Sequence, residues 1–297
     1  IYTMVSSSAA SDVYKRQDRL CEEDFTLPPQ QADAAVFSIA GPVTDGAYSR
    51  PPNIAWDVDM AEFRQRFSVD NCLLVNDFEA QAFACRSPVM EAVQTVVPGK
   101  VNVAAPLVVV GAGTGFGQAA LIPLHHSTHM AIPTENGHGS FPFERPAEMA
   151  LMQFLLNETG EPYVRTETIL SGSGLSRVHH FLSGQKRKPA EVAAAVDDDS
   201  KTLRWMARFF GRVCRNVALQ ILAYGGVYIA GGVAAKTPRL VTHTEFSQTF
   251  RRSATMGQVL DQIPVFLNTN EDSGLWGAAY RGVQLLKQNH LFQTDET

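Results

Sequence analysis

Short apolar runs rich in β-branched residues and longer segments with apolar residues at every third or fourth position divide the chain into regular elements. The short runs predict buried strands, and the segments with helical spacing predict amphipathic helices. The strands are expected at residues 34–43, 71–76, 227–230 and 263–267, and on both sides of a glycine-rich loop within 106–122. The helices are expected over 57–67, 77–83, 146–159 and 200–224, after 171, and from 273 onward. In the last helix, the small residues Gly274, Gly277 and Ala278 permit another helix to cross closely.

The glycine-rich loop has a glycine at every second position: Gly111, Gly113, Gly115 and Gly117. Because glycine accepts positive φ angles and has no side chain, a ligand can approach the peptide N–H groups, as a phosphate requires. The dinucleotide fingerprint does not fit, because Phe116 or Gln118 stands where its third glycine belongs, and no Walker Gly-Lys-Ser/Thr follows. The loop is therefore a phosphate-loop candidate of another kind. A glycine-rich hairpin that binds no ligand is the alternative.

Another glycine pair, Gly231-Gly232, directly follows the strand expected at 227–230. Such a pair lets a flat ring or a ribose lie against the backbone. A bare turn would have the same sequence, so both interpretations stay open here.

Asn76 and Asp77 stand where a predicted strand runs into a predicted helix. Ligands of α/β proteins bind at the carboxyl ends of strands, so a carboxylate here is well placed to accept a proton. The same two residue types also satisfy the free N–H groups at the start of a helix. Catalytic base and helix cap are therefore equal alternatives for Asp77.

Two further segments combine carboxylates with glycines. Glu135 and His138 lie beside Gly137 and Gly139, whose tight backbone can bring a carboxylate and an imidazole to one side of a loop, and Glu167 precedes a Ser-Gly-Ser-Gly turn. These side chains could hold a polyol, and a network that anchors the loop is the alternative. A zinc site with the nearby histidines is disfavoured, because their stretch, residues 124–130, is polar and has no helix to set ligand spacing. A solvated loop is expected there, and no metal ligand is assigned.

Composition narrows the function classes. The 297 residues, 45% hydrophobic and 19% charged, are enough for one large or two ordinary domains with ample core. A net charge of −5 and only short basic clusters argue against nucleic acid, and no apolar stretch is long enough to cross a bilayer. The four cysteines lack disulfide or zinc-ribbon spacing, which fits a reducing cytoplasm.

The first 25 residues show no amphipathic period and do not begin with Met. Residues 1–17 in particular look like a translated linker or sequencing scar. We therefore expect residues 1–25 to be a non-native or disordered leader outside the fold.

In this order, six motifs closely resemble the bacterial glucokinase family over roughly residues 34–287. They are Asn76-Asp-Phe78, Gly111-Ala-Gly-Thr-Gly-Phe-Gly117, Glu135-Asn-Gly-His138, Glu167 before Leu-Ser-Gly, Gly225 to Gly232, and Ser273-Gly-Leu-Trp-Gly277. The resemblance implies an α/β protein with the two-domain actin-like ATPase (ribonuclease H-like) fold. It implies a small domain of residues 26–104 completed by a helix at 276–297, a large domain of 105–275, and a homodimer. The related sugar kinases with a cysteine-rich zinc motif are disfavoured, because the cysteines are not clustered.

The resemblance also implies ATP-dependent phosphorylation of glucose to glucose 6-phosphate, with ATP and Mg²⁺. Asp77 would be the general base for the 6-hydroxyl, and the other hydroxyls would bind Asn53, Asn76, Glu135, His138 and Glu167. The phosphate loop would comprise Gly111, Gly113, Thr114, Gly115 and Gly117, and the adenosine motif would comprise Gly231 and Gly232. Carboxylates suit a sugar site because a wrong epimer leaves them without their hydrogen bonds.

One departure concerns the N-terminus. The family opens with a strand hairpin carrying Asp-x-Gly-Gly-Thr-Asn, its first phosphate motif, and nothing in residues 1–34 resembles it. We therefore expect the first strands of the small domain to be missing and the chain as written to phosphorylate glucose slowly. A non-catalytic sugar-binding or regulatory relative is the alternative function. The retained Asp77 speaks against it, because a binding protein needs no base.

Overall fold

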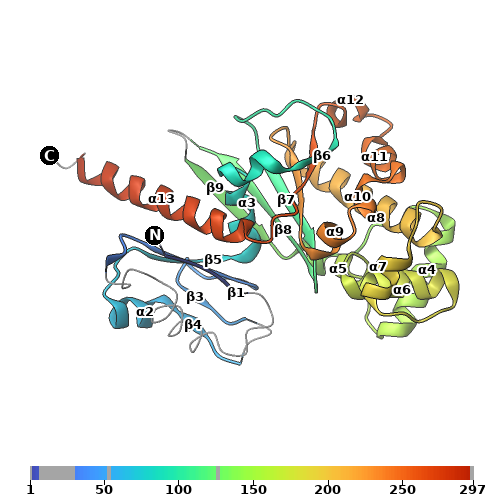
Figure 1. Cartoon of the computed structure of the whole chain (residues 1–297), viewed down its shortest axis with the longest axis horizontal. Helices are drawn as coiled ribbons and strands as arrows, with labels where there is room; N and C mark the ends of the chain where they lie inside the picture. The colour runs from blue at the N-terminus through green and yellow to red at the C-terminus, as the bar shows by residue number, and fades with distance from the viewer. Residues whose placement is uncertain (1, 7–30, 52–54, 125–127, 295–297) are drawn as a thin grey trace. The chain divides into compact units, whose positions relative to one another are not determined.

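The computed structural model describes residues 2–6, 31–51, 55–124 and 128–294, and divides into two compact units. Unit 1 comprises Ile1–Met90 and Asp272–Thr297, and unit 2 comprises Glu91–Glu271 (Figure 1). Residues 91–104, which were assigned to the small domain from the sequence, therefore belong with unit 2. The reason is a strand pairing, because β6 (Gln94–Val97) is antiparallel to β11 (Val265–Leu267).

Unit 1 contains a parallel three-stranded sheet in the order β1-β2-β5. The second strand, β2 (Ala35–Ile39), is buried at all five positions, because helices cover both faces of the sheet. Its residues Ala35, Phe37 and Ile39 pack with α2 (Met60–Phe67). Val36, on the opposite face, packs with buried alanines of α3 (Asp77–Ala84) and α13 (Ser273–Thr294). The strands and helices expected from the sequence in this unit are confirmed.

The first strand departs from the expectation of a leader outside the fold. Tyr2–Ser6 form β1, which pairs in parallel with β2 from Tyr2↔Ala35 to Ser6↔Ile39. The excluded segment thus supplies the backbone hydrogen bonds on one side of β2. The lack of a helical pattern of apolar residues did not exclude a role in the fold, because a strand of five residues has no such pattern.

Helices α3 and α13 cross at backbone contact. A Cβ atom on Gly277 would lie 1.7 Å from the carbonyl oxygen of Ala80, so only glycine fits this position of α13. The Ser273 hydroxyl also donates to Oε1 of Gln81, 2.7 Å away. The close crossing expected from the small residues of the last helix is confirmed, and it fixes the helix that begins at Asp77.

Unit 2 is built on a six-stranded mixed sheet in the order β6-β11-β10-β7-β8-β9. The strands β7 (Leu107–Ala112) and β8 (Phe116–Pro123) form the predicted strand–glycine loop–strand hairpin. On the other side of β7, β10 (Val227–Ala230) is parallel to it and to β11. The edge strand β9 (His129–Thr134) includes part of the stretch expected to be a solvated loop.

The predicted helices of unit 2 form with recognisable signals at their ends. In α4 (Pro146–Thr159), proline occupies the first turn and Gly160 ends the helix in a left-handed conformation. The side chains of Ser171 and Ser200 cap α6 (Gly172–Ser183) and α8 (Lys201–Ile221). The remaining helices of this unit are α5 (Thr166–Ile169), α7 (Pro189–Ala195), α9 (Gly232–Lys236), α10 (Arg239–Thr242), α11 (Thr244–Arg251), α12 (Gly257–Leu260) and the 3₁₀ turn η5 (Asn136–His138). The shorter elements outside it are β3 (Tyr48–Ser49), β4 (Val58–Asp59) and the 3₁₀ turn η3 (Pro88–Ala92), which ends in unit 2.

A fully buried ion pair lies in the core of unit 2. Arg212 of α8 donates two hydrogen bonds to the carboxylate of Glu148 of α4, over 2.7 and 2.8 Å, and both side chains have 0% exposure. Arg212 also donates to the carbonyl oxygen of Pro142 over 2.9 Å. Burial alone would raise the pKa of Glu148, but the hydrogen bonds from Arg212 and from two backbone N–H groups lower it. The pair therefore remains charged in the core.

The part of the chain that the structure describes has no helix both long enough and apolar enough to cross a membrane.

We predict that Gly277→Ala destabilises unit 1. Alanine favours a helix over glycine by about 1 kcal/mol, but its Cβ would meet the backbone of α3, which cannot move aside as a side chain can. Separating two packed helices costs about 1–3 kcal/mol or more, so the midpoint of urea unfolding should fall.

Gly257→Ala is the matched control, because a Cβ on Gly257 of α12 would meet nothing within 4 Å. That variant should unfold within about 0.5 kcal/mol of the unmodified chain. Equal midpoints for the two variants would contradict the crossing described here.

Candidate functional site

The glycine loop is the turn of the β7–β8 hairpin. Gly111 pairs with Gly117 and Ala112 with Phe116, which leaves Gly113, Thr114 and Gly115 as the turn itself. The N–H of Gly113 donates to the carbonyl of Gly115 over 2.9 Å and so closes the turn. Two of the predicted phosphate-loop glycines, Gly111 and Gly117, thus lie in strands.

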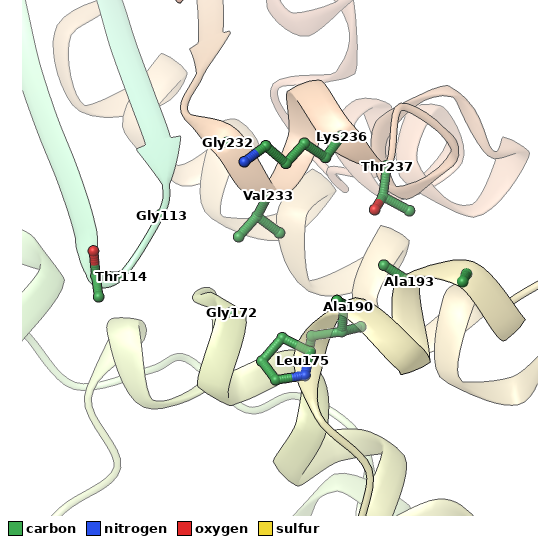
Figure 2. Close-up of a pocket in the computed structure, with 12 residues that line it drawn as sticks. Gly113, Thr114, Gly172, Leu175, Ala190, Ala193, Gly232, Val233, Lys236 and Thr237 are labelled. Atoms are coloured by element: carbon green, nitrogen blue, oxygen red, sulfur yellow. The ribbon is translucent and has the colours of Figure 1, made fainter.

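A pocket of about 590 Å³ lies beside this turn (Figure 2). The turn contributes Gly113 and Thr114, and the start of α9 contributes Gly232. The pocket therefore joins the two glycine motifs that were singled out separately in the sequence. The other lining residues are Gly172, Leu175, Pro189, Ala190, Ala193, Ala194, Val233, Lys236 and Thr237.

Gly231 allows these two motifs to meet. It has a φ of +86°, and a Cβ there would lie 2.6 Å from the carbonyl oxygen of Ala112 at the end of β7. Because β7 and β10 are parallel neighbours, their carboxyl ends reach the same edge of the sheet. The N-terminus of α9 consequently lies against the glycine hairpin.

The opposite wall of the pocket comes from α6 and α7. The N–H of Gly172, the first residue of α6, donates to the carbonyl of Gly113 over 2.9 Å and joins this helix to the hairpin. The α7 wall consists of Pro189 and three alanines. Neither this wall nor Lys236 was predicted from the sequence. The many alanines in residues 189–195 were the signal that could have indicated the wall. Figure 2 shows the Lys236 side chain extending back along α9 toward Gly232.

Glu135, His138 and Glu167 converge in a polar cluster. Nε2 of His138 lies 3.8 Å from Oε2 of Glu135, and Nδ1 of His138 lies 3.6 Å from Oε1 of Glu167. The side chains of Glu135 and His138 are 54% and 56% exposed, and that of Glu167 is 21% exposed. Three of the predicted sugar ligands therefore stand together on an accessible surface of unit 2.

Backbone pairing between two segments builds this cluster. Thr166 N–H donates to the carbonyl of Gly139 and Phe141 N–H to that of Val164, which aligns the end of the 135–140 loop with the segment that carries Glu167. A Cβ on Gly137 would lie 2.1 Å from the carbonyl oxygen of Phe116, so glycine is needed where the loop contacts β8.

Arg165 lies inside the cluster and was not singled out from the sequence. It hydrogen-bonds Glu161, Glu167 and Nδ1 of His138. The hydrogen bond with Glu161 raises the pKa of the Arg165 guanidinium, and the hydrogen bond from Arg165 lowers the pKa of Glu161.

The turn of the hairpin also contacts the polar cluster. A Cβ on Gly115 would lie 2.8 Å from Oε2 of Glu167. Gly113 and Thr114 line the pocket, whereas Gly115 is next to the carboxylate. The three-residue turn therefore separates an apolar pocket from the polar cluster.

The remaining predicted site residues belong to unit 1. Asn76 ends β5 (Cys72–Asn76) and caps α3, because its Oδ1 accepts from the N–H groups of Phe78 and Glu79 at 2.9 and 3.3 Å. Its Nδ2 donates to the carbonyl of Gly41. Asp77 is the first residue of α3 and not its cap, so the cap interpretation belongs to Asn76. Asn53 lies outside the described residues.

Among the residues that the structure describes, no three His, Cys, Asp or Glu side chains gather as a metal site.

Known proteins resemble this chain in sequence and in fold. A family model described as Glucokinase matches residues 6–285. The glucokinase of Trichormus variabilis (strain ATCC 29413 / PCC 7937) is 30% identical over 288 positions, covering 86% of this chain and 84% of that protein.

Solved structures confirm the predicted actin-like ATPase fold. A glucokinase from an Antarctic psychrotroph matches with a TM-score of 0.77 at 26% identity, over 91% of this chain and 85% of that one. The Balamuthia mandrillaris glucokinase, solved in complex with glucose, matches with a TM-score of 0.75 at 19% identity, over 92% and 84%. From the sequence match over most of its length, together with this shared fold, the chain belongs to the glucokinase family.

Proposed function

We propose that this protein transfers the γ-phosphoryl group of ATP to the 6-hydroxyl of glucose. One observation carries the proposal: the turn at residues 113–115 has the pocket on one side and the Glu167 carboxylate on the other. A nucleotide in the pocket and a sugar on the cluster would meet at backbone N–H groups that suit a phosphoryl group. A purely sugar-binding relative would not need the pocket.

The pocket supports the nucleotide half of the proposal. Its volume of about 590 Å³ lies within the range of about 300–1,000 Å³ that is usual for small-molecule sites. Its small, mostly apolar wall suits a flat base, and the start of α9 would offer N–H groups to phosphates. Mg²⁺ would enter with the nucleotide, since it commonly keeps phosphate and water ligands and needs few protein carboxylates.

The polar cluster supports the sugar half. Carboxylates accept hydrogen bonds from hydroxyls, and bonds to an ionised acceptor are stronger than neutral ones. We assign Glu135, His138 and Glu167 to hydroxyls of glucose, and we keep Asn53 and Asn76 as further sugar ligands. The side chain of Asn76 already hydrogen-bonds the backbone on two sides, which leaves one amide hydrogen for a sugar.

Asp77 is proposed as the general base. Its carboxylate would accept the 6-hydroxyl proton while that oxygen forms the bond to the γ-phosphorus and the bond to the leaving ADP breaks. Its place at the first position of α3 favours a negative charge, because the helix dipole is positive there.

Two further assignments rest on the family and remain predictions. We propose that the protein works as a homodimer in the cytoplasm. Light scattering of the full chain would measure the mass in solution, and a monomer at micromolar concentration would contradict the dimer.

Glu135→Gln should weaken glucose binding. Amide nitrogen replaces one acceptor oxygen, so a charge-assisted hydrogen bond is lost, which costs about 1–3 kcal/mol. Calorimetry with glucose measures this directly and does not depend on turnover. Glu158→Gln on the exposed face of α4 is the control, and an unchanged affinity in Glu135→Gln would remove Glu135 from the site.

Asp77→Asn should lower turnover by about 10²–10⁴-fold, the contribution of a positioned base. Glucose affinity should stay within a few-fold, because the amide can still hydrogen-bond the hydroxyl. Glucose 6-phosphate formation should be followed by ³¹P NMR with ATP and Mg²⁺. Asp70→Asn, exposed in the same unit, is the control; comparable rates in the two variants would exclude Asp77 as the base.

Ala190→Phe should raise the KM for ATP by about tenfold or more, because the ring would occupy the space proposed for the nucleotide. The KM for glucose should change little. Ala147→Phe is a matched control: Ala147 is exposed and, like Ala190, follows the proline that opens a helix. A normal KM for ATP in Ala190→Phe would place the nucleotide elsewhere.

A further inference from the structure

Arg165 connects the members of the polar cluster. Its Nε donates to Oε2 of Glu161 over 3.0 Å, and its Nη2 donates to the other oxygen of the same carboxylate. Its Nη1 donates to Oε1 of Glu167 and lies 3.1 Å from Nδ1 of His138. One guanidinium is thus held by Glu161 on one side and contacts two proposed sugar ligands on the other.

The contact with His138 fixes the state of the imidazole ring. A guanidinium can only donate hydrogen bonds, so Nδ1 of His138 must be the acceptor. An imidazole that accepts at Nδ1 is neutral and carries its proton on Nε2. Oε1 of Glu167 lies 3.6 Å from the same nitrogen, too far for a hydrogen bond, so it does not compete with Arg165 for Nδ1.

The contact with Glu167 fixes the direction of that carboxylate. Its Oε1 is occupied by Arg165, whereas Oε2 faces the hairpin turn at Gly115. The Glu161–Arg165 ion pair holds the guanidinium in this orientation, because the side chains of both residues are less than one third exposed.

We propose that Arg165 is a positioning residue that sets which atoms of the sugar site donate and which accept. This proposal rests on the function proposed above. With Arg165 in place, Nε2–H of His138 donates, and Glu135 and Oε2 of Glu167 accept. Nε2 of His138 and Oε2 of Glu135 are 3.8 Å apart, so one hydroxyl oxygen about 2.8 Å from each can accept from the first and donate to the second.

This arrangement has a consequence for ligand choice. The site requires a hydroxyl that accepts and donates at the same point, which a polyol provides and an ether oxygen does not. Deoxygenation or methylation of that hydroxyl should therefore weaken binding, because the Nε2–H of His138 or the carboxylate of Glu135 would lose its partner.

Arg165→Met tests the proposal, since it keeps a long side chain and removes every donor. In protein labelled with ¹⁵N-histidine, the unmodified chain should show His138 with a protonated Nε2 and an unprotonated Nδ1, and His138→Gln identifies the signals. The variant should lose this single tautomer. Its KM for glucose should rise about five- to twentyfold, while kcat and the KM for ATP change less than about twofold.

Two variants accompany this test. Arg251→Met, at the exposed last residue of α11, is the matched control and should leave all values unchanged. Arg165→Lys keeps the charge and one donor nitrogen, so it should recover part of the KM change. It also serves as the test variant if Arg165→Met unfolds.

The outcomes separate the two claims. A protonated Nδ1 in the unmodified chain, or an Arg165→Met variant with unchanged ring signals and an unchanged KM for glucose, would overturn the role of Arg165. Failure of the unmodified chain to bind glucose in calorimetry would refute the proposed function, while the NMR spectra would still decide whether Arg165 sets the His138 tautomer.

Discussion

The buried ion pair of Arg212 and Glu148 is the constraint on which the polar cluster depends. Two charges without water are costly unless they are paired and hydrogen-bonded, and here Glu148 also accepts from the N–H groups of Glu144 and Arg145. Nε of Arg212 makes no hydrogen bond within the part of the chain that the structure describes, but it lies 3.4 Å from Oε1 of Glu144. These bonds and the bond to Pro142 hold the chain just after the 135–140 loop. The rings of Phe141 and Phe209, with centroids 5.8 and 5.6 Å from the guanidinium carbon, complete the enclosure.

The ion pair fixes the geometry of the polar cluster through the neighbouring backbone. Phe141 is fixed beside Arg212, and its N–H pairs with Val164. This pairing sets the register of the segment that carries Arg165 and Glu167 against the loop that carries Glu135 and His138. The side chains of the polar cluster are thus exposed, but the atoms that determine their positions are in the core, where packing permits little movement.

Local signals in the sequence were sufficient for the hairpin and the capped helices, because each depends on residues near one another in the chain. The small residues of the last helix indicated a close crossing, but not that α3 is the helix they cross. The edge strand β9 was missed because its polar start predicts a loop, and its pairing with β8 decides the conformation. The four site motifs of unit 2 could be singled out one by one, but their assembly around one turn required the sheet order. Arg165 and the α7 wall were missed for a related reason. An arginine or an alanine has no distinctive role until a residue distant in sequence, such as His138 for Arg165, lies next to it.

The side chain of Asn76 hydrogen-bonds two separate segments of the backbone, and this affects the interpretation of activity changes in Asn76 variants. Its Oδ1 holds the first turn of α3, and its Nδ2 holds the carbonyl of Gly41 in the loop after β2. The start of the helix and that loop therefore move as one rigid piece, with Asp77 attached to it. Any replacement of Asn76 would loosen this piece and shift the neighbouring carboxylate, whether or not the amide touches a sugar. A loss of activity at position 76 would thus report on the mechanical support of Asp77 as much as on a lost ligand contact.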